Sequence, residues 1–323
     1  MQRVSAIMHK LHILHYNKDL GSCLYNSHFK LKFMKTATNI DEQLNLLKNR
    51  GMIIEDEKKA KEILLDVGYY RLGFYWFPQE KHYPSKHKRQ HFFNENASFK
   101  QAADLYYADF RIRNILMPYL SRIEVNLRTF VIYHVSNHFK QKPIWFADRN
   151  VMRPEFLSSL PNLYDNIKKN EIIKRHHLKY PNDIYAPAWK TLEYMTLGDI
   201  LILIKNIKDT EIPKNIANHF GIINLNVFFS YIDTIRVLRN LCAHGHNIFD
   251  LNLNKSIKAG VLKSEMTGEM HHNLCGVLLV MLYLLKFISI NRCYEMKKQL
   301  KEELNRPDTA SLGQIINYIS DVL

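Results

Sequence analysis

The sequence predicts an all-α protein. It contains 11 glycines and 10 prolines in 323 residues, which is too few for a turn-rich β protein of this length. Apolar side chains recur at helical spacing along most of the chain, and no segment alternates between apolar and polar residues as a half-buried strand does. Hydrophobic residues make up 46% of the chain, enough to bury a core between packed helices.

Start and stop signals divide the first hundred residues into short helices. One helix should begin after Thr38 or Asn39, with acids in its first turn, and end at Gly51. A second is expected over residues 55–68. The next stretch, YYRLGFYWFPQ, is so rich in aromatic rings that core packing explains it better than base stacking does. A polar, basic and turn-rich loop should follow.

The longest helical pattern extends over residues 98–139. A capping box of Ser98 and Gln101 should open it, and Pro118 should kink or split it. Further helices are expected over residues 154–170, 187–207, 211–220, 224–243, 271–290, 292–305 and 310–322. The most apolar run, 276–290, is interrupted by Lys286 and is short for a membrane span, so we expect a core helix there.

Charge indicates the class of partner. The chain has 45 basic against 31 acidic residues, a net charge of +14. Such an excess favours a polyanion, either nucleic acid or an anionic membrane surface, although a merely basic protein is the alternative. The four cysteines are far apart and show neither metal-site nor disulfide spacing. Without a secretory signal in the sequence, we expect a cytoplasmic protein with no cofactor.

The first 33 residues differ from the rest, with little periodicity and few acids. We interpret residues 1–33 as an extension ahead of a natural start at Met34; the alternative is an N-terminal arm that packs on the body. The remainder divides into an N-terminal helical block over 34–96 and a larger helical bundle over 97–323.

The segment LRNLCAHGHNIFD contains the main candidate site. Arg239 and Asn240 come near the end of the amphipathic helix expected over 224–243, and His244 follows one turn later. A buried arginine needs a partner. Arg239 therefore either pairs within the protein or receives a phosphate group.

Four segments, in order, resemble the Abi-like proteins of bacterial abortive infection, of the AbiD/AbiF type. They are LLKNRGMIIEDEKKAKEILLDVGYYRLGFYW, SFKQAADLYYADFRIRNILMPYLSRIEVNLRTFVIYH, PAWKTLEYMTLGDI and LRNLCAHGHNIFD. The resemblance extends over about residues 40–250. It implies a HEPN-like helical bundle with additional helices, from which the block over 34–96 stands apart.

In HEPN ribonucleases an arginine is followed a few residues later by a histidine, often with a polar residue directly after the arginine. Arg239, Asn240 and His244 resemble this signature. The resemblance implies a metal-independent endoribonuclease that acts as a toxin in phage defence. The ribose 2′-OH would attack the neighbouring phosphate. His244 would move the proton, Arg239 would bind the scissile phosphate and Asn240 would orient one of them.

The spacing of the motif bears on the oligomeric state. Residues five apart on an ideal helix point about 140° away from one another, so Arg239 and His244 of one chain do not face each other. HEPN enzymes commonly pair two domains around one cleft. The resemblance therefore implies a homodimer with a composite site.

Other residues are weaker candidates. Glu124 and Arg128 have ion-pair spacing on one helix and would support the site, and His246 directly follows the motif. The candidate RNA-contacting residues are Arg71, Lys86, Lys88 and Arg89. Arg128 with His134 also satisfies the loose Arg–His pattern, and we interpret that match as a coincidence within a core helix.

A binding function is the alternative to catalysis. In that case the chain would hold a small structured RNA in a defence ribonucleoprotein, and the motif would contribute only to RNA affinity. The resemblance implies RNA partners in both cases, as a substrate and as a non-coding RNA that restrains the protein. The net positive charge suits both, and neither reading involves a membrane.

Overall fold

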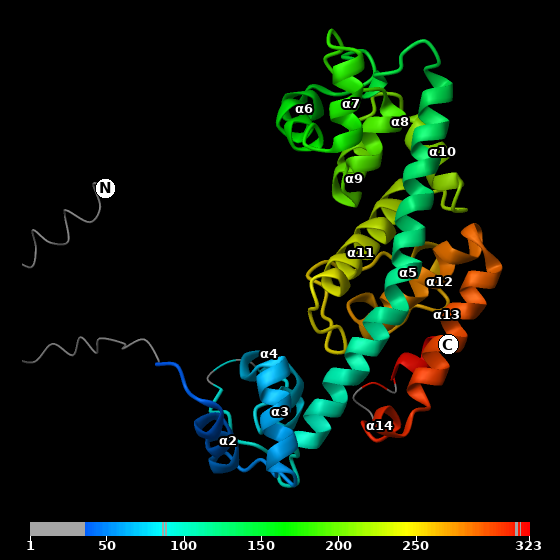
Figure 1. Ribbon diagram of the computed structural model, residues 1–323. Helices are drawn as coiled ribbons and strands as arrows, with labels where there is room; N and C mark the ends of the chain where they lie inside the picture. The colour runs from blue at the N-terminus through cyan, green and yellow to red at the C-terminus, as the bar shows by residue number, and fades with distance from the viewer. Residues whose placement is uncertain (1–35, 86, 88, 314–315, 317) are drawn as a thin grey trace, which may run out of the picture. The chain divides into compact units, whose positions relative to one another are not determined.

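Helix α5 (Phe99–His138), 40 residues long, is the element against which most other helices pack (Figure 1). Pro118 was expected to kink or split this helix, and the split does not occur, because α5 continues on both sides of the proline. Pro118 has no N–H, so the carbonyl of Asn114, four residues earlier, lacks its helical hydrogen bond. Both residues are exposed, so this carbonyl lies on the solvent side of the helix. Leu116 and Leu120 are fully buried on either side of the proline and hold the helix against the core.

The computed structural model describes residues 36–85, 87, 89–313, 316 and 318–323. The extension predicted for residues 1–33 lies outside this range. Residues 40–323 form one compact unit by their contacts. No strand occurs among the described residues, where backbone pairing between extended segments is limited to isolated bridges. The all-α prediction is confirmed.

Three helices form the N-terminal part of the compact unit. They are α2 (Ile40–Asn49), α3 (Glu57–Val67) and α4 (Tyr69–Trp76). Asp56 caps α3, because its side chain accepts a hydrogen bond from the backbone N–H of Lys59. The helices enclose a small core that includes Leu47, Leu72 and Trp76, and Phe99 from the first turn of α5 joins it.

The start of α5 is capped differently from the prediction. Ser98 is the N-cap residue, but its side chain makes no capping hydrogen bond, so the capping box with Gln101 is wrong. Gln79, which lies in the turn after α4, satisfies the backbone of Ser98 instead. Its Oε1 accepts from the Ser98 N–H at 2.6 Å, and its Nε2 donates to the Ser98 carbonyl at 3.1 Å.

The middle of the chain contains more breaks than predicted. Its elements are α6 (Pro154–Ile167), α7 (Glu171–Lys179), α8 (Ala188–Thr191), α9 (Leu197–Lys205), α10 (Glu211–Asn218) and α11 (Leu225–Ala243). The single helix predicted over 187–207 is wrong, since Thr196 and Asp199 form a capping box that starts α9 anew. Helix α7, capped by Asn170, was not predicted.

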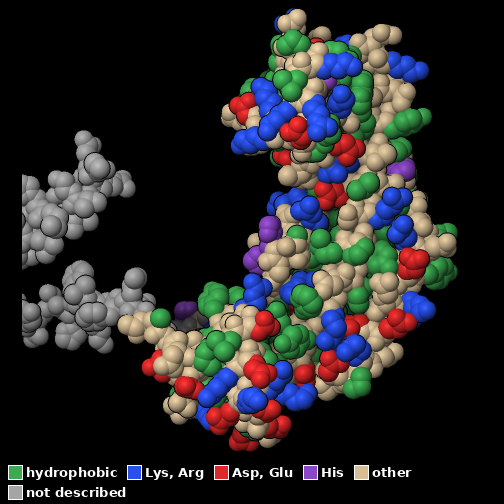
Figure 2. All heavy atoms as spheres, in the orientation of Figure 1, with side chains coloured by type: hydrophobic (Ala, Val, Ile, Leu, Met, Phe, Trp, Pro, Cys, Tyr) green, Lys and Arg blue, Asp and Glu red, His purple; other side chains and the backbone are tan. Residues whose placement is uncertain are grey.

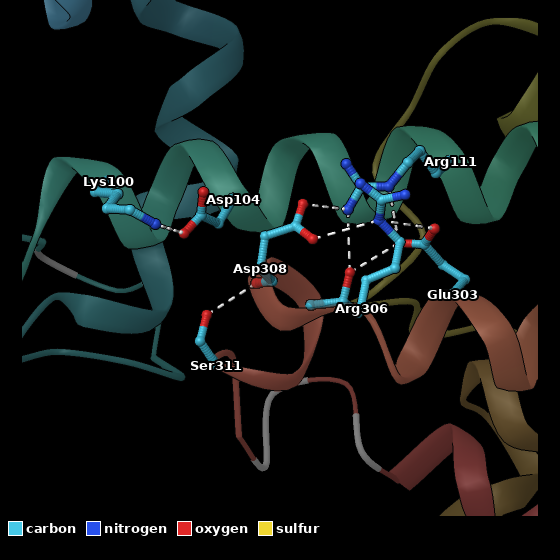
Figure 3. Close-up of polar contacts among 8 residues, drawn as sticks. Lys100, Asp104, Arg111, Glu303, Arg306, Asp308 and Ser311 are labelled. Atoms are coloured by element: carbon cyan, nitrogen blue, oxygen red, sulfur yellow. Dashed lines mark hydrogen bonds and ion pairs between the residues drawn. The ribbon is translucent and has the colours of Figure 1, made fainter.

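The C-terminal helices cover another side of α5. They are α12 (Leu274–Ile288), α13 (Ile290–Leu304) and the short α14 (Pro307–Ala310). Helix α12 is buried along most of its length, as predicted for a core helix, and no helix among the described residues is long and apolar enough to cross a membrane. Figure 3 shows how Arg111 of α5 joins this part: its guanidinium donates to Glu303 at 2.8 Å and to Asp308 at 2.8 Å.

Candidate functional site

Helix α11 carries the candidate residues. The side chain of Asn224 accepts hydrogen bonds from two backbone N–H groups of its first turn, which fixes where the helix begins. One face packs into the main core through Phe228, Tyr231, Ile232, Ile235 and Leu238. This packing leaves Arg239 and Asn240 partly exposed and His244 exposed at the C-terminal end of the helix.

A glycine ends α11 directly after the candidate histidine. Gly245 adopts φ +67°, a left-handed conformation that favours glycine. The backbone N–H of His246 donates to the carbonyl of Leu241 at 2.9 Å, and the backbone N–H of Gly245 donates to the carbonyl of Cys242 at 3.2 Å. This pair of bonds is a Schellman motif, which satisfies the last carbonyls of the helix. It fixes the backbone on both sides of the His244 side chain.

Arg239 belongs to a cluster of charged and polar groups between α11 and α5. Its Nε lies 3.2 Å from Oε2 of Glu124, and its Nη1 donates to Oδ1 of Asn240 at 3.3 Å. The second oxygen of Glu124 accepts from Nη2 of Arg128 at 2.7 Å, so the ion pair expected between these two α5 residues is present. The buried carboxylate of Glu124 thus lies between two guanidinium groups and orients both.

The outer part of this cluster is open to solvent. The side chain of Arg239 is 39% exposed, whereas that of Glu124 is 10% exposed. Arg128 is buried and also donates to the carbonyl of Met195 at 3.0 Å. The imidazole of His244 makes no hydrogen bond to the cluster, among the interactions of the described residues. Figure 2 shows histidine and basic side chains at the surface over α11.

A second polar cluster, not predicted from the sequence, holds the loop that follows α11. Asp109 of α5 is fully buried. Its Oδ1 accepts from the backbone N–H groups of Ile248 at 3.0 Å and Phe249 at 2.9 Å. Its Oδ2 accepts from Tyr75 at 2.9 Å and from Nη1 of Arg113 at 2.6 Å.

Arg113 extends this cluster to the motif itself. Its Nη1 also donates to the carbonyl of His246 at 2.7 Å. Burial raises the pKa of Asp109, and the opposite charge of Arg113 works against that rise. The i, i+4 spacing of Asp109 and Arg113, within an otherwise apolar face of α5, is the sequence signal that could have identified them as a buried ion pair.

The residues predicted to contact RNA fall into three groups. Arg71 of α4 donates to the carbonyl of Gly245 at 2.6 Å, so it lies beside the end of α11. The guanidinium of Arg89 donates twice to Glu80, at 2.9 and 2.6 Å, and stacks on the ring of Phe77. Lys86 and Lys88 lie outside the described residues.

The second Arg–His pattern does not form a cluster. Arg128 turns towards Glu124, whereas His134 stacks on the ring of Phe130 and its buried Nε2 has no hydrogen-bond partner. Within the described part of the chain, no group of three or more His, Cys, Asp or Glu side chains is arranged to hold a metal ion.

The site is built from segments far apart in sequence: α4, the middle of α5 and the end of α11 with its following loop. The family model of the Abi-like proteins matches residues 62–250, which takes in all of these segments and more than half of the chain. The chain therefore belongs to the Abi-like protein family, whose members act in abortive infection, a form of bacterial defence. No curated protein and no solved structure matches the chain.

Proposed function

We propose that this protein is a metal-independent endoribonuclease of an abortive infection system, with Arg239, Asn240 and His244 acting on the RNA backbone. The observation that carries the proposal is the setting of Arg239. Glu124 and Asn240 hold its guanidinium in place, and the side chain is still 39% exposed. An oriented and accessible guanidinium is suited to binding a phosphate through two hydrogen bonds.

The proposed chemistry follows from these groups. Arg239 binds the scissile phosphate and stabilises the charge that builds up as the 2′-OH attacks. His244 moves a proton to or from the reacting oxygens, because an imidazole can both accept and donate a proton. The P–O bond to the 5′-oxygen breaks, which leaves a 2′,3′-cyclic phosphate and a 5′-OH. Arg239, Asn240 and His244 resemble the HEPN signature, which supports this assignment.

We propose further that the site is completed in a homodimer. In one chain the His244 imidazole has no hydrogen bond to Arg239, and residues five apart on a helix diverge by about 140°. A second copy would supply the histidine for the arginine of the first. Mixing the Arg239→Ala and His244→Ala proteins tests this arrangement, because a mixed dimer then keeps one complete site and should regain cleavage. Failure to regain any cleavage would contradict the composite site.

The cleavage assay uses single-stranded RNA in the presence of EDTA. Arg239→Ala and His244→Ala should each reduce cleavage by about 100-fold or more and abolish toxicity to the host cell, while RNA binding changes little. The matched controls are Arg122→Ala and His138→Ala, which alter exposed residues of α5 away from the motif. Equal cleavage by the motif variants and the controls would contradict the proposal.

A non-catalytic RNA-binding protein is the second candidate. The separation of the His244 imidazole from the Arg239 cluster favours it, as does the net charge of +14. In that case the wild-type dimer cuts no RNA, and the His244→Ala protein remains as toxic as the wild type.

A further inference from the structure

A pocket of about 650 Å³ lies along α11, between this helix, the end of α9 and the segment over residues 251–258. Both apolar and polar residues line it, and the polar and charged ones are the more numerous. Its lining includes Lys205, Phe229, Asp233, Arg236, Lys255 and Lys258. This pocket does not include the Arg239 cluster.

The pocket carries an excess of positive charge. Four of its lining residues are basic, and Asp233 is its one acidic lining residue. Asp233 is already paired with Arg236, whose Nη2 lies 2.7 Å from its Oδ1. Lys205, Lys255 and Lys258 have no acidic partner within the described part of the chain. Uncompensated cations around a concave surface attract an anionic ligand.

An aromatic ring accompanies these cations. The partly exposed ring of Phe229 lines the pocket, and Nζ of Lys205 lies 4.9 Å from its centroid. A flat apolar ring beside cations suits a ligand that combines bases with phosphates, because the ring stacks on a base while the lysines contact the backbone. Single-stranded RNA offers unstacked bases for such contacts.

The pocket lies on the same side of α11 as Asn240 and His244, two of the three motif residues. At about 100° per residue, His244 lies roughly 20° from both Asp233 and Val237 around the helix axis, and Asn240 lies roughly 40° from His244. The rise of 1.5 Å per residue puts His244 about 12 Å beyond Arg236 along the axis. A strand bound in the pocket and running along α11 would therefore pass Asn240 and reach His244.

We infer that this pocket is a binding subsite for single-stranded RNA, which holds the strand along α11 on its way to His244. The inference rests on the proposed function for the direction of the strand and its destination. Lys255, Lys258 and Lys205 contact phosphates, and Phe229 stacks on a base.

Binding of an uncleavable RNA tests the subsite. The probe is a fluorescent single-stranded RNA of about ten nucleotides with 2′-O-methyl riboses, which lack the attacking hydroxyl. Its affinity is measured by anisotropy for the full chain. The double variant Lys255→Glu/Lys258→Glu should bind about tenfold more weakly or worse, with a shallower dependence on salt. Phe229→Leu, which keeps the apolar packing, should weaken binding about fivefold.

The control makes the same change of charge elsewhere. Lys58→Glu/Lys301→Glu alters two exposed lysines of α3 and α13 and should change affinity less than about twofold. If both double variants weakened binding equally, the effect would come from overall charge and the inference would be overturned. Unchanged binding by the pocket variant would also overturn it. Because the probe cannot be cut, this result is independent of catalysis. A protein that binds through the pocket but cuts no RNA would contradict the proposed function alone.

Discussion

The carboxylate of Asp109 accepts a hydrogen bond at 2.9 Å from the backbone N–H of Phe249, 140 residues further along the chain. This contact ties the middle of α5 to the loop after α11. The same carboxylate pairs with Arg113, which in turn holds the carbonyl of His246. The position of the candidate histidine therefore depends on a buried ion pair outside the motif.

Asp109→Asn should strongly destabilise the fold. The amide keeps the size of the carboxylate but leaves the buried Arg113 without a counter-charge, which costs about 3–5 kcal/mol of the free energy of unfolding. Urea unfolding measures the loss. Asp104→Asn, five residues earlier on α5, breaks only the pair with the exposed Lys100 and should cost less than about 1 kcal/mol. Similar losses for both variants would contradict the role assigned to Asp109.

Glu124→Gln should reduce both stability and cleavage, because it removes the carboxylate that orients Arg128 and Arg239. We expect a loss of about 3 kcal/mol in the free energy of unfolding. The matched control is Glu171→Gln, whose i, i+4 partner Arg175 is 70% exposed and whose pair contributes about 0.5 kcal/mol or less. If both variants retained wild-type stability and cleavage, Glu124 would have no positioning role.

Gly245→Ala should destabilise the end of α11. A side chain is strained at φ +67°, and its Cβ would lie 3.2 Å from Nη1 of Arg71. We expect a cost of about 1–2 kcal/mol, measured by thermal unfolding. Gly73→Ala is the control. Its Cβ would make only ordinary contacts within helix α4, so alanine should be neutral or stabilise by about 0.5 kcal/mol. If Gly73→Ala cost more stability than Gly245→Ala, the Schellman geometry at Gly245 would be excluded.

Cys242, two residues before His244, should resist alkylation in the folded protein. Burial raises the pKa of its thiol to about 12 from 9.0, so the reactive thiolate is roughly a thousandfold scarcer at neutral pH than for an ordinary cysteine. The sign of the shift means that reactivity appears only as the pH rises towards that pKa or when the protein unfolds. Peptide mapping after iodoacetamide treatment, with and without urea, compares it with the part-exposed Cys293. Equal labelling of the two in the folded state would refute the burial of Cys242.

Local patterns were sufficient to predict several of the helices, α5 and α11 among them. The apolar spacing before Arg239 marks α11 to within a residue of its observed start, and the spacing of Glu124 and Arg128 indicates their ion pair. Patterns failed where a contact or a cap overrode the periodicity. Thr196 begins a new helix inside an apolar run, and Gln79 replaces the capping box expected at Ser98.

The contacts that build the site could not be predicted because they join distant segments. Arg239 meets Glu124 only when α11 packs on α5, and Arg71 reaches Gly245 across 174 residues. The i, i+4 spacing of Asp109 and Arg113 gives a local hint of an ion pair. Their hydrogen bonds to the loop over 246–249 depend on tertiary packing, which residue spacing does not encode.

The chemical ends of RNA fragments test the central claim most directly. Purified wild-type protein is incubated with single-stranded RNA in EDTA, and the products are analysed by mass spectrometry beside those of His244→Ala. Cleavage through Arg239 and His244 predicts fragments with a 2′,3′-cyclic phosphate and a 5′-OH from the wild type and almost none from the variant. Intact RNA with the wild-type protein, or the same fragments in equal yield from His244→Ala, would contradict it.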